Sequence, residues 1–133
     1  MFSNFGKDGS VWHSIMEKTF AKRYGNYQRM TGGYLYAGVS ALNGSPWKEY
    51  WNSELDEDKL WDLIVKHDKM NDIITCGTSV DSSNGISGSH AYTILSHYEL
   101  KTNRGKVRLL KVRNPWGTEE YKGPWSDSSR LWT

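Results

Sequence analysis

The chain has 133 residues and a net charge of +2 at pH 7; 24% of its residues are charged and 14% are aromatic. This length suits one domain, and the many rings supply enough apolar surface for a core, which excludes a disordered chain. The near balance of basic and acidic residues excludes a nucleic-acid-binding surface. No apolar run approaches the roughly 20 residues of a membrane span. We expect one globular unit over residues 1–133, with no nucleic-acid partner and no transmembrane segment.

The chain has a single cysteine, Cys76. One thiol excludes an internal disulfide framework and a cysteine-rich zinc site. The first residues lack the basic stretch and apolar run of a signal peptide. Together these features predict a reducing, cytoplasmic setting.

The first predicted helix covers residues 11–24. Its apolar side chains recur at helical spacing: Trp12, Ile15, Met16, Phe20 and Tyr24. Ser10 is expected to cap the start of this helix, and Gly25 to end it in the left-handed conformation. The following residues 31–47 are rich in Gly and Tyr and predict a loop with a short strand at most.

A second helix is predicted for residues 54–67, where Leu60, Trp61 and Ile64 form an apolar face. Ser53 followed by Asp56 resembles a capping box, and acidic residues load the first turn. Because each of the two helices carries a tryptophan on its apolar face, we expect both to cover a sheet.

The strands follow in the second half of the chain. We expect a short strand at 72–75, an exposed mobile loop at 81–89, a strand at 90–100, a turn at 102–105 and a return strand at 107–113. The last two strands make an antiparallel hairpin. The predicted fold class is therefore α+β, a twisted and mainly antiparallel sheet with a few flanking helices.

His90 opens the first strand of this hairpin and Asn114 closes the second, so the two side chains should be cross-strand neighbours. Pro115 breaks the ladder after Asn114. An Asn amide can accept the N–H of one imidazole nitrogen and leave the other free to act on a thiol, as in a Cys-His-Asn triad. Trp116 would then cover the hydrogen bond. The other interpretation is a turn closed by Asn-Pro, with the tryptophan filling the core.

The remaining candidates for chemistry are weaker. His13 and His67 lie on predicted helices and are read as helix surface or dipole partners, and His97 lies within a strand. Cys76 ends an apolar strand without the electropositive, partly exposed surroundings of a reactive thiolate, so a buried structural cysteine is favoured. We expect its sulfur to lie far from the His90 ring.

Several segments resemble the second half of the calpain protease core. They are Trp12 to Tyr27, Thr31-Gly32-Gly33, Cys76-Gly77-Thr78, Gly88-Ser89-His90-Ala91-Tyr92, Arg113-Asn114-Pro115-Trp116-Gly117 and Pro124-Trp125-Ser126-Asp127. The resemblance covers nearly the whole chain. It implies a papain-like cysteine protease half, in which the other half of the core carries the nucleophilic Cys and the oxyanion Gln. That Cys-bearing half is the implied partner of residues 1–133.

The resemblance also assigns roles to individual residues. It implies that His90 is the general base, Asn114 its orienter and Trp116 a shield over both. Gly33 and Ser89 would line the substrate backbone; the family has Gly where this chain has Ser89, so a side chain stands where the peptide would approach.

A calcium site transfers in part, because the family's acidic ligands fall on Glu120 and Asp127. Two carboxylates cannot supply the six to eight oxygens that calcium takes, so this site is expected to be partial and to bind calcium weakly or not at all in this chain.

The sequence thus predicts the His/Asn half of a calcium-dependent cysteine endopeptidase that cleaves intracellular proteins and is inactive without its other half. Three alternatives remain open. They are a catalytically inactive calpain-like interaction module, a transferase or deamidating enzyme that uses the same triad, and an enzyme that uses Cys76 as its nucleophile.

Overall fold

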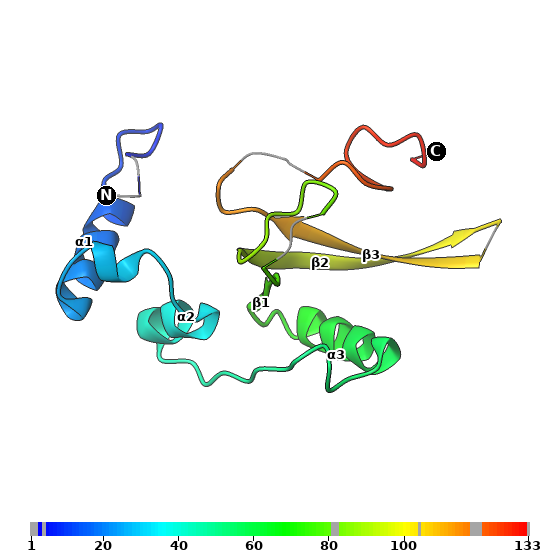
Figure 1. Cartoon of the computed structure of the whole chain (residues 1–133), viewed down its shortest axis with the longest axis horizontal. Helices are drawn as coiled ribbons and strands as arrows, with labels where there is room; N and C mark the ends of the chain where they lie inside the picture. Colours follow the sequence, from blue (N-terminus) through cyan, green and yellow to red (C-terminus); the bar gives the residue numbers. More distant parts are fainter. Residues whose placement is uncertain (1–2, 4, 81–82, 104, 118–120, 133) are drawn as a thin grey trace. The chain divides into compact units, whose positions relative to one another are not determined.

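The computed structural model describes residues 3, 5–80, 83–103, 105–117 and 121–132. The chain divides into two compact units, residues 1–38 and 39–133. The elements follow in the order α1 (Trp12–Tyr24), η1 (Gln28–Met30), α2 (Leu35–Asn43), α3 (Glu57–Lys69), β1 (Ile74–Gly77), β2 (Ala91–Thr102) and β3 (Gly105–Arg113) (Figure 1). Helices and an antiparallel sheet in separate stretches of the chain confirm the predicted α+β class.

The first helix, α1, lies where the sequence predicted it, but its start differs. Ser10 does not cap it; the residue before the helix is Val11, which makes no side-chain cap. The reason is a local turn, in which the Ser10 N–H donates to Asp8 Oδ1 at 2.9 Å and the Ser10 carbonyl accepts from the Gly6 N–H at 2.8 Å. At the other end Gly25 has a φ of 101°, which confirms the glycine stop.

The segment predicted as a loop contains a helix. α2 covers Leu35–Asn43 (LYAGVSALN), and the described residues 31–47 contain no strand. The prediction was wrong because it weighted the surrounding Gly and Tyr residues. Two leucines and two alanines among these nine residues favour a helix enough to offset Gly38.

The helix α3, Glu57–Lys69, begins three residues later and ends two residues later than predicted. Its cap is Asp56, whose Oδ1 accepts the Lys59 N–H at 2.8 Å, rather than Ser53. At the other end, Nδ1 of His67 in the last turn is hydrogen-bonded at 2.7 Å to Asp72, which lies past the end of the helix. A carboxylate at the first turn and basic residues in the last one suit the helix dipole at both ends.

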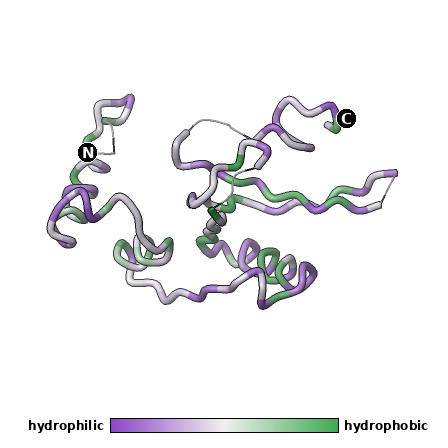
Figure 2. The backbone as a smooth tube through the Cα atoms, in the orientation of Figure 1, coloured by the Kyte–Doolittle hydropathy of each residue, from purple (hydrophilic) through white to green (hydrophobic). Residues whose placement is uncertain are grey.

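The sheet has the strand order β1-β2-β3, and both pairs are antiparallel. In the short pair Cys76 lies opposite Tyr92, and in the long pair Thr93 lies opposite Arg113. A register shift between Ile94 and Ser96 interrupts the long pair. These strands confirm the predicted hairpin, along which hydrophobic residues recur (Figure 2).

The loop and the turn of the predicted sheet are described in part. Residues 81–82 and 104 lie outside the described part of the chain. Within the loop, Ser83 and Ile86 form an isolated antiparallel bridge, so a tight turn occupies its centre.

The helix α3 packs against β1 and β2. The side chain of Asp68 accepts from the His97 N–H at 3.2 Å and is also bonded to the Nδ1 atom of that ring. Trp61 meets the His97 ring edge-on at 5.8 Å, and the guanidinium of Arg108 lies 5.4 Å from the centre of the Trp61 ring. α3 therefore covers the sheet as expected, whereas α1 packs against η1 in the first unit. No helix in the described residues is both long and apolar enough to cross a membrane.

Candidate functional site

The backbone of His90 is fixed where β1 ends and β2 begins. The Thr78 N–H donates to the His90 carbonyl at 3.0 Å, which extends the β1–β2 pairing by one step. The His90 N–H donates to the Thr78 hydroxyl at 2.9 Å. An imidazole at this position projects from a hydrogen-bonded backbone, although it lies just outside the strand.

The imidazole of His90 is hydrogen-bonded to the side chain of Asn114, which follows the last residue of β3. The Nε2···Oδ1 distance is 2.8 Å. A carbonyl oxygen can only accept, so Nε2 carries the proton, and in the neutral ring Nδ1 holds a free lone pair. The predicted cross-strand contact is therefore present, and it selects one tautomer.

Trp116 contacts both members of this pair, Asn114 through its backbone and His90 through its ring. Its N–H donates to Asn114 Oδ1 at 3.0 Å, so the same oxygen accepts from both Trp116 and His90. Its indole lies against the imidazole, with ring centres 4.1 Å apart and planes tilted by 41°. The indole is 61% exposed, so one face covers the imidazole while much of the ring remains in contact with solvent.

Two residues that the sequence reasoning missed also contact His90 or its loop. The ring of Tyr92 meets the imidazole edge-on at 4.8 Å, and its hydroxyl accepts the Ser87 N–H at 2.9 Å. Thr78 is the other. A signal for Tyr92 was available, because residues two apart on a strand share a face. Thr78 could be found only by assigning the register of β1 against β2.

The amide nitrogen of Asn114 is buried and has no hydrogen-bond partner in the described part of the chain. A buried N–H₂ group without an acceptor loses its hydration without replacing it. Among the described residues the amide is therefore held through its oxygen, by the bonds to His90 and Trp116.

Cys76 lies in β1, and burial raises the pKa of its thiol. A raised pKa favours the neutral thiol over the nucleophilic thiolate. No hydrogen bond joins Cys76 to His90 within the described residues, where the imidazole contacts Asn114, Trp116 and Tyr92. These properties match a structural cysteine.

The other expected site residues are placed as follows. Ser89 is exposed and has a φ of 48°, and its N–H donates to the Ser79 carbonyl. Gly33 belongs to the first unit, between η1 and α2, where an added Cβ would meet no atom within 4 Å. The structure brings together His90, Asn114 and Trp116, with Ser89 next to His90 in the chain.

The acidic residues of the expected calcium site are only partly described. Glu120 lies outside the described residues, and Asp127 is exposed in the segment after β3. The described part of the chain contains no cluster of three His, Cys, Asp or Glu side chains that could hold a metal ion. Asp127 is therefore the one expected calcium ligand that lies among the described residues.

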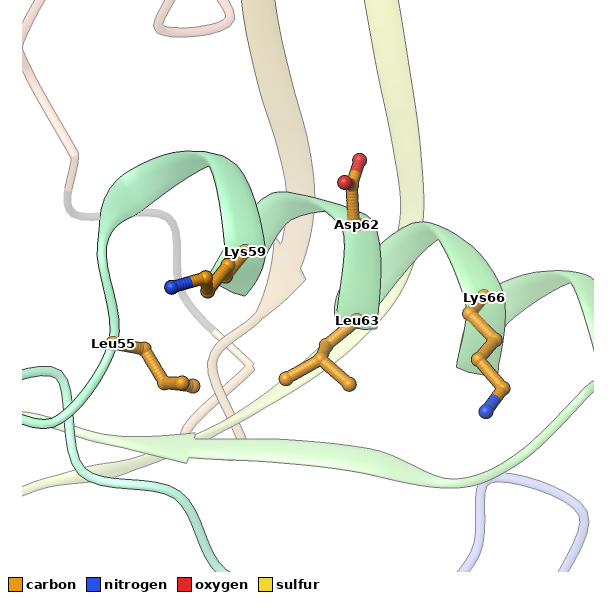
Figure 3. A pocket seen from close by; sticks show the side chains of 5 residues that line it. All are labelled: Leu55, Lys59, Asp62, Leu63 and Lys66. Carbon is orange, nitrogen blue, oxygen red and sulfur yellow. The ribbon is translucent and has the colours of Figure 1, made fainter.

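A separate pocket of about 320 Å³ is formed by α3 and by Leu55, which precedes the helix. Its lining consists of Leu55, Lys59, Asp62, Leu63 and Lys66 (Figure 3). None of these residues belongs to the group around His90.

A profile of the family described as calpain family cysteine protease matches residues 1–133. The chain belongs to the calpain family of cysteine proteases. It is 29% identical to calpain-9 of Mus musculus, 32% to the calpain-type cysteine protease ADL1 of Oryza sativa subsp. japonica and 28% to calpain clp-1 of Caenorhabditis elegans. Each match covers 99% of this chain but only 20%, 6% and 18% of the respective relative. The chain therefore spans a fifth or less of these calpain-family proteins.

Proposed function

We propose that residues 1–133 form the C-terminal, His/Asn-bearing half of a calpain-type cysteine endopeptidase core. The observation that carries this proposal is the 2.8 Å hydrogen bond from His90 Nε2 to Asn114 Oδ1. Such a bond prepares an imidazole to act as a general base through its other nitrogen. Membership of a cysteine protease family supports the same reading.

In this proposal the Cys-bearing first half of the core is the partner. His90 Nδ1 takes the proton of that thiol and gives a thiolate–imidazolium pair. The thiolate attacks the peptide carbonyl, and the imidazolium then returns the proton to the leaving amine. Asn114 keeps Nε2 as the donor throughout, and Trp116 limits the access of water to that hydrogen bond.

Residues 1–133 should be inactive without the Cys-bearing half. Cys76 is the sole thiol of the chain, and its burial favours the neutral form. A base without a nucleophile, and without donors for the developing oxyanion, lacks the interactions that supply most of the rate.

We further propose that Gly33 and Ser89 line the backbone of protein substrates in the complete core. Ser89 adopts a left-handed backbone, which favours the glycine of the family pattern. A lone thiol suits a reducing compartment, so the proposal includes a cytoplasmic protease. Calcium dependence is also proposed, with Asp127 and Glu120 as partial ligands, but no step of the mechanism depends on it.

The proposal is tested with a chimera in which residues 1–133 replace the second half of a calpain core and are joined to its Cys-bearing first half. We expect hydrolysis of casein by the chimera and none by residues 1–133 alone. His90→Ala should lower kcat by about 10⁶, the scale of losing a triad base. Asn114→Ala should lower it by about 100-fold, because the ring remains but its aim is lost.

Cys76→Ser is the matched control and should leave turnover unchanged. A folded chimera that binds casein but does not cleave it would instead favour the inactive interaction module. Turnover by residues 1–133 alone, lost on Cys76→Ser, would favour the alternative in which Cys76 is the nucleophile.

A further inference from the structure

The hydroxyl of Thr78 joins the two ends of the loop that leads into His90. It accepts the His90 N–H at 2.9 Å and donates to the Ser87 carbonyl at 2.7 Å. The His90 carbonyl lies 3.2 Å from the same hydroxyl and is also bonded by the Thr78 N–H. Because a hydroxyl has one proton, the shorter contact to Ser87 takes it.

The residue before His90 adds strain to this loop. Ser89 has a φ of 48°, a left-handed conformation that costs free energy for a residue with a Cβ. Its N–H is bonded to the Ser79 carbonyl, one residue beyond Thr78. Hydrogen bonds of the Ser89 and His90 N–H groups therefore hold this strained backbone in place.

We propose that Thr78 is a positioning residue for His90. Its hydroxyl fixes the His90 backbone, and that backbone sets the approach of Nε2 to Asn114 Oδ1. The inference rests on the proposed role of His90 as general base. It predicts that the loss of one hydroxyl outside the His90–Asn114 pair changes where the imidazole carries its proton.

The test uses the ¹⁵N-labelled chain and long-range ¹H–¹⁵N spectra of the neutral imidazoles. The wild type should show His90 protonated at Nε2. In Thr78→Val the bond from His90 Nε2 to Asn114 Oδ1 should be lost. The ratio of the Nε2–H to the Nδ1–H form should then fall about fivefold, the change that one hydrogen bond of ordinary net strength produces. Thr78→Ser keeps the hydroxyl and should restore the wild-type ratio.

Two controls separate positioning from mere stabilisation. Ile94→Val shortens a buried side chain of the same sheet and should lower the melting temperature without changing the tautomer ratio. Thr19→Val removes a hydroxyl that bonds the Ile15 carbonyl in α1 and should leave His90 unchanged. A Thr78→Val spectrum that matches these controls would overturn the proposal.

Failure of the positioning role and failure of the proposed function give different spectra. A wild-type His90 that carries its proton on Nδ1 would remove the basis of the proposed function. A wild-type Nε2–H form that persists in Thr78→Val would refute only the positioning role. Should Thr78→Val not fold, Thr78→Ser and the wild type carry the test: the His90 amide must exchange slowly in both, and exchange at the rate of the unfolded chain would overturn the proposal.

Discussion

Replacing Ser89 with glycine should stabilise the unit that contains the sheet. Ser89 has a φ of 48°, its side chain is exposed, and its described hydrogen bond uses only the backbone N–H. A left-handed backbone costs a residue with a Cβ about 1–2 kcal/mol. Glycine loses about 0.5–1 kcal/mol more backbone entropy on folding, which offsets part of that gain. The expected net stabilisation is about 0.5–1 kcal/mol.

Amide hydrogen exchange of sheet residues measures this change within the second unit alone. Protection of the Ile94 and Val112 amides should rise about two- to fivefold in Ser89→Gly. Ser83→Gly is the matched control: it is an exposed serine of the same loop without a positive φ, so glycine should not raise protection there. A Ser89→Gly chain that is no more protected than wild type, or that behaves as Ser83→Gly does, would refute the reasoning.

The backbone N–H of Lys59 lowers the pKa of Asp56, so the helix stabilisation from Asp56 should be present above about pH 3.9, its unfolded value, and be lost as the pH falls through the lower folded value. Circular dichroism during acid titration should show this loss, Asp56→Asn should remove the pH-dependent part, and Ser53→Ala should change nothing. Burial raises the pKa of Cys76, so iodoacetamide should alkylate the native chain about tenfold more slowly than the urea-unfolded chain, and equal rates would contradict the burial. Calcium should bind residues 1–133 with a dissociation constant on the order of millimolar or weaker by calorimetry, and micromolar binding lost in Asp127→Asn would show that the ligands are misplaced.

The hairpin was predictable because its signals are local. Alternating side chains between a Gly/Ser-rich loop and an Asn-Pro break define both strands to within one or two residues of β2 and β3. Once two adjacent antiparallel strands are known, the start of one and the end of the other must be neighbours. The His90–Asn114 contact therefore follows from the sequence without any knowledge of the rest of the fold.

The errors arose where several local partners compete. Ser10 is a good capping residue, but its carbonyl accepts the Gly6 N–H, and the first helical hydrogen bond goes to the Val11 carbonyl instead. Asp56 caps α3 in place of Ser53, because both residue types suit that role and only the helix boundary decides between them. In α2, the Gly and Tyr content suggested a loop although the chain is helical. Propensity sums over short windows do not resolve such cases.

The contacts that hold His90 show why part of the site was hidden from the sequence. Its side-chain partner, Asn114, comes from the neighbouring strand of a hairpin, whereas its backbone partner, Thr78, comes from β1 across a longer loop. The first contact depends on a turn, and the second depends on the register of a third strand. A one-residue slip in that register would turn the side chains of the strand to the opposite face of the sheet. The imidazole is thus placed by the ends of three strands. A substitution that shifts the β1–β2 register should therefore disturb His90 even when the hairpin that carries Asn114 stays intact.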